Sequence, residues 1–257
     1  MKLPVAVQHW IVPGLVVLAW QVTGDAGLAP EYLSTPTDIF RALWEVTSDG
    51  ELAAALAASL YRVAAGYLLG ATAGVLAGLA AGIVPAVRNF FDPLVSLLLA
   101  VPKIAFFPVV IMLFGIGHAS KIVMIAVSCF FPLFVAARAA VGAVNQKLLW
   151  AGRNMGAPPR TLFVRVVLPD ALPRIFAGLR IGLAHAFVVL FAAELISSNS
   201  GLGSLITEGE NADRFDLMFA GIFCFAVLGF AADRLLLRLR ARLLRGQLIS
   251  TEEQVSP

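Results

Sequence analysis

Long apolar runs alternate with short polar segments along the chain, and this alternation predicts an all-α integral membrane protein. A run of about 20 apolar residues is long enough for a helix to cross the hydrocarbon of a bilayer. The pattern predicts about six transmembrane helices, near residues 10–22, 60–84, 93–116, 121–141, 175–197 and 215–237. The connections between these runs are short, so we expect one membrane domain and no large soluble one.

The first apolar run has a second interpretation. It follows Lys2, and Gly27 and Ala29 loosely imitate the small-x-small site of a secretory signal peptide. We favour a membrane helix, because the basic segments between the later spans all fall on the cytoplasmic side only if this run is counted as a span.

An acidic segment follows, from Asp25 to Ser59. Thr35 is suited to cap a helix, with Pro36 at its first position and Asp38 near the positive end of the helix dipole. Three apolar side chains then share one face of that helix: Ile39, Leu43 and Trp44. We expect a helix that lies on the outer leaflet, and the alternative is a docking surface for an external partner.

The second run carries a glycine at every fourth position: Gly66, Gly70, Gly74, Gly78 and Gly82. Small residues at this spacing let a neighbouring helix approach closely. Because a step of four residues turns the stripe by about 40°, we expect it to wind round the helix and to pack against more than one neighbour.

The third run is interrupted by Pro102 and Pro108. A proline removes a backbone donor and clashes with the preceding turn, so one continuous helix is disfavoured. Lys103 lies in this break. A charge at membrane depth marks a candidate translocation path, although a lysine can also reach the interface.

A polar, basic segment separates the fourth and fifth runs, from Asn145 to Pro173; we call it the platform. Its pattern predicts two short amphipathic helices, the first ending at Gly156 and the second running from Pro159 to Pro169. Such a helix pair beside a membrane bundle is suited to lie in the groove of a partner protein. The alternative is an interfacial element without a partner.

Composition and charge support this view and orient it. Of the 257 residues, 60% are hydrophobic and 14% are charged, with a formal net charge of +3 and a mean hydropathy of +0.88. The basic residues gather on the platform side, whereas the two large opposite loops hold only Arg41 and Arg214. This asymmetry predicts a cytoplasmic platform and cytoplasmic amino and carboxyl termini, and it does not indicate nucleic acid. We expect the polar end of the chain, residues 250–257, to be disordered.

Motifs for catalysis are absent from the sequence. It contains no P-loop, no G-x-S-x-G and no H-E-x-x-H, so hydrolysis by those routes is excluded. Cys129 and Cys224 lie inside apolar runs, where we expect no disulfide and no metal. Glu194, near the outer end of the fifth run, is a second candidate for the translocation path, and the alternatives are a satisfied hydrogen bond between helices or a place on an exposed rim.

The platform resembles the EAA loop of ABC importer permeases, whose pattern is Glu-Ala-Ala, three residues, Gly, and then a spaced Leu-Pro. The matching segment, residues 150–173, reads WAGRNMGAPPRTLFVRVVLPDALP. Further matches to the nitrate, sulfonate and taurine branch, which includes permeases for pyrimidines and phthalate, extend over nearly the whole chain. They lie at Leu33–Pro36, Ser59–Arg62, Pro102–Ala105, Phe114–Gly117, Glu194–Gly203, Asp216 and Gly221.

The resemblance implies a non-catalytic type I permease. It would form a homodimer in the bacterial inner membrane, take solute from a periplasmic or lipid-anchored binding protein, and alternate access as two separate ATPase subunits bind ATP-Mg. It would bind no cofactor itself. Residues 1–58 would hold the first span and the external segment, residues 59–240 the permease core with the coupling loop 145–173, and residues 241–257 a cytoplasmic tail.

The resemblance also assigns the contacts to the ATPase. They fall on Trp150, Ala151, Gly152, Arg153, Gly156, Ala157, Leu168 and Pro169. Trp150 stands where the family has Glu, and Gly152 replaces its second Ala. A nitrate-, sulfonate- or taurine-like anion, or a related small organic compound, is the expected solute. The alternative is a stand-alone channel or facilitator that needs no ATPase.

Overall fold

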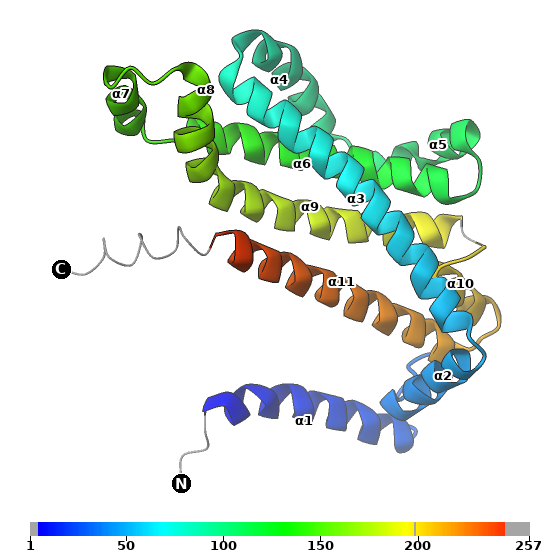
Figure 1. Cartoon of the computed structure of the whole chain (residues 1–257). Coiled ribbons are helices and arrows are strands. Elements are labelled where there is room, and N and C mark those ends of the chain that lie inside the picture. The colour runs from blue at the N-terminus through cyan, green and yellow to red at the C-terminus, as the bar shows by residue number, and fades with distance from the viewer. Residues whose placement is uncertain (1–4, 198, 245–257) are drawn as a thin grey trace. The chain divides into compact units, whose positions relative to one another are not determined.

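The computed structural model describes residues 5–197 and 199–244, with side chains from residue 11 onward, so the expected disordered end lies outside the described residues. Every element of regular structure within these ranges is helical (Figure 1). The elements are α1 (Val5–Asp25), α2 (Pro36–Ser48), α3 (Glu51–Ile83), α4 (Pro85–Ala100), the 3-10 turn η1 (Lys103–Phe106), α5 (Phe107–Phe114), α6 (His118–Gly142), α7 (Gln146–Asn154), α8 (Pro159–Leu162), the π-turn η2 (Phe163–Val167), α9 (Leu168–Ile196), α10 (Leu202–Asn211) and α11 (Phe215–Leu243).

Four helical segments of the described chain are long and apolar enough to cross a membrane. They are Glu51–Ile83, His118–Gly142, Pro159–Ile196 and Phe215–Leu243. The pair Pro85–Ala100 and Lys103–Phe114, bent by 90°, makes a fifth if it is counted as one broken span. In the first predicted span, the apolar stretch Ile11–Asp25 is shorter than these.

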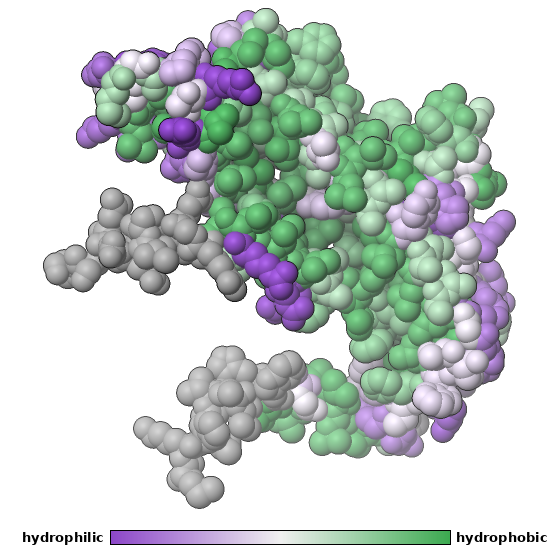
Figure 2. Space-filling view, viewed as in Figure 1, coloured by the Kyte–Doolittle hydropathy of each residue, from purple (hydrophilic) through white to green (hydrophobic). Residues whose placement is uncertain are grey.

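The chain folds into two units, which we describe separately. The first unit comprises Met1–Ser59 and Glu194–Val227, and the second comprises Leu60–Ala193 and Leu228–Pro257. In the second unit, hydrophobic residues cover the long helices and hydrophilic ones gather on α7 and α8 (Figure 2).

In the second unit, α3 packs on α6 along its glycine stripe. A Cβ at Gly66 would lie 2.8 Å from the carbonyl oxygen of Ile122, and one at Gly74 would lie 2.6 Å from that of Phe130. All five glycines of the stripe face α6 among the described residues, where we expected several neighbours. The reason is that the row of every fourth residue is inclined to the helix axis, and α6 follows that row with its own residues at the same spacing.

The same small-residue packing joins α9 to α6. A Cβ at Gly182 would lie 2.9 Å from Leu133, and the hydroxyl of Tyr67 on α3 donates to the carbonyl of Leu179 on α9 at 2.8 Å. Backbones that approach this closely gain dispersion contacts that lipid cannot match. Helices α3, α6 and α9 therefore form the packed centre of this unit.

The third predicted span is broken, as the prolines indicated. Helix α4 ends at Ala100, and Pro102 precedes the 3-10 turn η1. Pro108 lies in the first turn of α5, where its missing N–H costs no hydrogen bond.

The end of the platform corrects one prediction. Pro169 does not end the second platform helix, because the helical path continues from α8 through η2 into α9. In η2 the N–H of Leu168 donates to the carbonyl of Phe163, a wide π-type turn. The wide turn relieves the clash between a proline ring and the preceding turn, so the chain passes Pro169 without a break.

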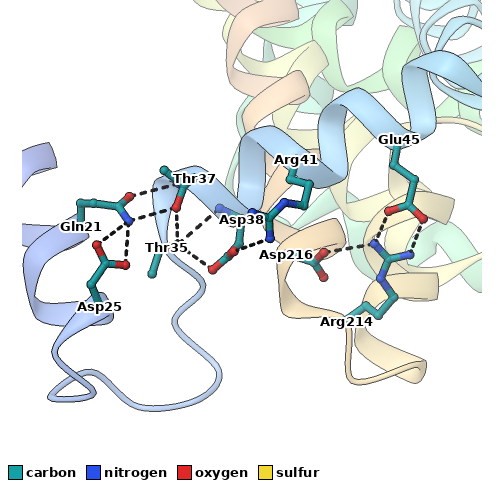
Figure 3. Close-up of polar contacts among 9 residues, drawn as sticks. All are labelled: Gln21, Asp25, Thr35, Thr37, Asp38, Arg41, Glu45, Arg214 and Asp216. Carbon is teal, nitrogen blue, oxygen red and sulfur yellow. Dashed lines mark hydrogen bonds and ion pairs between the residues drawn. The ribbon is translucent and has the colours of Figure 1, made fainter.

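In the first unit, α2 begins as its sequence predicted. The side chain of Thr35 accepts a hydrogen bond from the N–H of Asp38, and Pro36 occupies the first turn (Figure 3). The apolar face agrees with the expected one at Ile39, which is buried, and at Leu43, which packs beside it. It differs at Trp44, which is 76% exposed, and Ala42 is buried as well. The buried face packs against Trp20 of α1 and Ala220 of α11. These tertiary contacts place Ala42 on the buried face and leave Trp44 outside it.

The segment before α11 also corrects a prediction. The predicted fifth and sixth spans leave the stretch before Arg214 as one of the two opposite loops, and the structure forms helix α10 there. Leu202, Leu205 and Ile206 give it one buried face. The spacing of these residues is a helical signal, and the acidic residues Glu208 and Glu210 that follow them obscure it.

Candidate functional site

The platform is built on helix α7, whose two ends are both fixed by local hydrogen bonds. At its start, the side chain of Asn145 accepts from the N–H of Lys147 at 3.0 Å. At its end, Gly156 adopts a φ of +75°. The N–H of Gly156 donates to the carbonyl of Arg153 at 2.9 Å, and the N–H of Ala157 donates to that of Gly152 at 3.0 Å.

These two bonds form a Schellman motif, which requires a left-handed residue just beyond the helix. Glycine adopts that conformation without the steric cost that a Cβ adds. Gly156 therefore sets the direction in which the chain leaves α7, and it is the corner that sequence reasoning placed there.

Gly152 explains how α7 and α8 come together. It is buried, and a Cβ at this position would meet the side chain of Leu162. Glycine at the place of the family's second Ala therefore lets Leu162 pack directly on the α7 backbone. Because only the tip of a flexible side chain stands in the way, an alanine here would be accommodated by a shift of Leu162.

The other predicted coupling residues lie in two groups. Trp150 is 59% exposed, and Ala151 and Arg153 are exposed with it on α7. Leu168 and Pro169 are half-buried in the first turn of α9, so they support the platform rather than belong to its free surface. An indole exposed to this extent on a short helix is typical of a binding surface.

A groove of about 650 Å³ lies beside α7 within the second unit. Leu149 and Arg153 line it from α7, Phe163 lines it from η2, and the ends of α3 and α6 close it at Gly82 and Val141. The groove therefore lies between the platform and the ends of two membrane helices.

Lys103 takes part in the broken span of the second unit. Its ammonium donates long hydrogen bonds to the carbonyls of Leu99 at 3.4 Å and Val101 at 3.5 Å, and it lies 5.6 Å from the ring centroid of Phe131. These carbonyls lack partners at the end of a helix, where a cation is favourable. Lys103 thus caps the end of α4.

Glu194 belongs to the first unit and is completely buried. Its carboxylate accepts from the hydroxyl of Ser59 at 2.9 Å and from the N–H of Gly203 at 3.0 Å. The Ser59 hydroxyl in turn accepts from the N–H of Leu202 at 2.9 Å. Ser59 and Glu194 therefore accept hydrogen bonds from two N–H groups that would otherwise be unbonded at the start of α10. Glu194 thus takes part in hydrogen bonds between helices, as one of the alternatives for this residue predicted.

Sequence reasoning missed a buried basic cluster in the second unit. Arg62 and Lys121 are 2% and 1% exposed. Arg62 donates from Nε to Nδ1 of His118 at 3.2 Å, and Lys121 donates to the carbonyl of Gly117 at 3.3 Å. The sequence did contain a signal for this cluster, because Arg62 lies inside the second apolar run. A charged residue at such a position is costly and indicates a functional site.

Both cysteines are free and buried. Among the residues that the structure describes, no group of three or more His, Cys, Asp or Glu side chains is placed to hold a metal ion.

Comparison with known proteins gives consistent matches. The family model described as "Binding-protein-dependent transport system inner membrane component" matches residues 70–245. The chain is 35% identical over 236 residues to the putative aliphatic sulfonates transport permease protein SsuC of Bacillus subtilis (strain 168), covering 91% of this chain and 86% of that protein. It is 34% identical over 234 residues to the taurine transport system permease protein TauC of Escherichia coli (strain K12), covering 89% and 85%.

A solved structure shares the fold. An inward-facing structure of the MetNI methionine ABC transporter matches with a TM-score of 0.54 at 19% identity, covering 82% of this chain and 96% of that chain.

Proposed function

The chain belongs to the family of binding-protein-dependent transport system inner membrane components, among the ABC importer permeases related to sulfonate and taurine permeases, and we propose that it forms the translocation path for a small anionic solute. ATP hydrolysis belongs to a separate partner chain in this proposal. Two such ATPase subunits hold ATP-Mg and drive alternating access.

The platform is the proposed contact with the ATPase. The observation that carries this proposal is the exposed Trp150 on a helix whose end is fixed by the Schellman motif at Gly156. A rigid amphipathic helix with an aromatic anchor is suited to lie in a groove of a partner. Because α7 packs on α8 through Gly152 and Leu162, and the helical path continues from α8 into α9, a movement of the seated helix is passed to α9.

The remaining partners follow from the family. The permease functions as a homodimer in the bacterial inner membrane, with the platform and both termini in the cytoplasm, and it receives solute from a binding protein on the other side. The charge asymmetry of the loops supports this orientation.

The proposed solute is a sulfonate-, taurine- or nitrate-like anion, and related small organic compounds such as a pyrimidine or phthalate belong to the same proposal. The names of the relatives SsuC and TauC support the anion. Lys103 remains a candidate for the path, because its charge in the broken span is complementary to an anion. The hydrogen bonds of Glu194 favour a structural role for that residue.

Trp150→Ala tests the coupling contact, with Trp44→Ala as the matched control. Both residues are exposed tryptophans on short helices, and only Trp150 lies on the platform. We expect Trp150→Ala to reduce ATP-driven uptake about tenfold or more, as for loss of an interface anchor, while the permease still assembles. In a pull-down, Trp150→Ala should capture less ATPase than the wild type, and Trp44→Ala should capture the same amount.

Uptake at the wild-type level in Trp150→Ala would remove the tryptophan from the coupling contact. A pull-down from native membranes tests the wider proposal. An active, monodisperse permease that captures no ATPase would support the stand-alone channel instead.

A further inference from the structure

A hollow of about 450 Å³ lies between α9 and the second half of α11, within the second unit. Its wall is apolar, formed by Leu183, Ala184 and Phe187 of α9 and by Gly229 and Phe230 of α11. Gly229 makes room for it, because a Cβ there would meet only the ring of Phe187, at 3.7 Å. The volume lies in the range of ligand-binding pockets.

An ion pair stands at the rim of this hollow. Arg180 donates from Nε to Oδ1 of Asp233 at 2.6 Å and from Nη2 to Oδ2 at 3.1 Å. The pair occupies one edge of the guanidinium, so the Nη1 donors are available to a further acceptor. The side chain of Arg180 is 58% exposed and that of Asp233 is 24% exposed, so the ion pair lies at the surface, where Arg180 is open to a ligand.

A second guanidinium contacts one of the aromatic rings that line the hollow. Arg234 stacks over the ring of Phe230, with its Cζ 4.7 Å from the ring centroid. The lining residues Arg180 and Asp233, together with Arg234 beside Phe230, carry a net positive charge next to the apolar wall.

The charged residues at the hollow lie near the basic carboxyl-terminal end of α11. Arg238, Arg240 and Arg242 follow Arg234 on the same helix. Basic pockets between membrane helices, on the side where cationic residues gather, match the head groups of anionic lipids. The apolar wall matches an acyl chain, and exposed guanidinium groups at membrane depth are stabilised by an anionic partner.

We propose that this hollow is a binding site for one anionic phospholipid. Its phosphate accepts hydrogen bonds from the free edge of Arg180 and from Arg234, and one acyl chain lies along Ala184, Phe187 and Gly229. Charge complementarity selects an anionic lipid over a zwitterionic one, and Asp233 holds Arg180 in the orientation that presents Nη1 outward.

Two variants and a control test the site by native mass spectrometry. The full-length chain is released from nanodiscs that contain equal amounts of phosphatidylglycerol and phosphatidylcholine. Arg234→Gln removes the cation that stacks over Phe230, and Ala184→Phe fills the apolar wall at an exposed position. Arg242→Gln is the matched control, because it removes an exposed arginine from the same helix outside the hollow.

We expect the wild type to retain phosphatidylglycerol in preference to phosphatidylcholine. Arg234→Gln should reduce that preference about fivefold, the effect of one basic residue near the membrane surface. Ala184→Phe should abolish retention, and Arg242→Gln should change it less than about twofold. Equal retention of the two lipids by the wild type, or equal losses in Arg234→Gln and Arg242→Gln, would overturn the proposal.

The other possible occupants give different results with Ala184→Cys. An efficient disulfide between two copies in native membranes would assign the hollow to a second copy of the chain. Protection of the cysteine from a maleimide by added taurine would assign it to a transported solute. Either result overturns the lipid site, whereas protection by phosphatidylglycerol alone supports it.

Discussion

The hydroxyl of Ser59 donates a hydrogen bond to the carboxylate of Glu194 at 2.9 Å, and neither side chain has any exposed surface. The two residues lie 135 positions apart in the chain. Through them the first turn of α10 gains acceptors for the N–H groups of Leu202 and Gly203. A carboxylate that a membrane helix would otherwise bury at great cost is thus turned into a helix cap.

Glu194→Ala should therefore destabilise the protein strongly. It leaves the buried N–H of Gly203 and the hydroxyl of Ser59 without this acceptor, and each unsatisfied group costs about 1–3 kcal/mol. Glu194→Gln keeps one acceptor oxygen, so we expect thermal stability in detergent to fall in the order wild type, Glu194→Gln, Glu194→Ala. Equal melting temperatures for the three proteins would contradict the capping role.

Gly70→Ala should weaken the packing of α3 on α6. The added Cβ would collide with the backbone of Ala126, which cannot rotate away as a side chain can. Overpacking costs about 1–3 kcal/mol, and the gain in helix propensity of at most about 1 kcal/mol does not offset it. The control is Gly142→Ala, since a Cβ there meets nothing within 4 Å. Thermal unfolding in detergent should separate the two variants, and equal stability would refute close packing at Gly70.

Gly156 can be tested through the left-handed conformation that it adopts. Asparagine tolerates a positive φ better than alanine, and a β-branched residue tolerates it least. We expect ATP-driven uptake to fall in the order Gly156, Gly156→Asn, Gly156→Ala, Gly156→Val, with expression in the membrane largely unchanged. A valine variant that transports as well as the asparagine variant would show that the corner does not matter.

The variant Lys103→Met distinguishes a role of Lys103 in the translocation path from its role in capping the end of α4. The hydrogen bonds of Lys103 are long, so their loss should cost less than about 1 kcal/mol of stability. If the charge serves an anionic solute, uptake of that solute should fall several-fold while the melting temperature is preserved. Unchanged uptake would show that Lys103 only caps α4 and does not belong to the translocation path.

The Arg214 cluster of the first unit should respond to salt rather than to alkaline pH. Hydrogen bonds to Glu45 and then to Asp216 raise the pKa of Arg214 above its ordinary value (Figure 3). A raised pKa contributes stability that is present below the unfolded-state value and lost only as pH rises through the folded one. Both values lie above the working range, so between about pH 7 and pH 10 the arginine adds no pH dependence.

Removal of Arg214 should have a small effect on stability, because its ion pair with Glu45 is exposed to solvent. Arg214 is 41% exposed and Glu45 is 53% exposed, so Arg214→Gln should cost about 1 kcal/mol or less at low salt. The difference from wild type should shrink in about 0.5 M NaCl, because screening weakens exposed pairs. A difference that salt leaves unchanged would indicate a buried rather than an exposed pair.

The sequence by itself determined the class of the protein and the local features that depend on neighbouring residues. Apolar runs of span length, the cap at Thr35, the break at Pro102 and the corner at Gly156 are consequences of backbone chemistry within a few residues. The resemblance of the platform to the EAA loop is carried by the same kind of local pattern, and the family that it indicated is confirmed by the family match.

Only the tertiary structure decided which partner each surface meets. The glycine stripe faces α6 alone among the described residues, Trp44 lies outside the buried face of α2, and Glu194 is a cap for α10. These outcomes depend on helices that are distant in the chain, because lipid and protein offer a helix similar apolar surroundings and close fit selects between neighbours. Periodicity reveals an apolar or small-residue face, and the shape of the neighbouring helix decides what that face contacts.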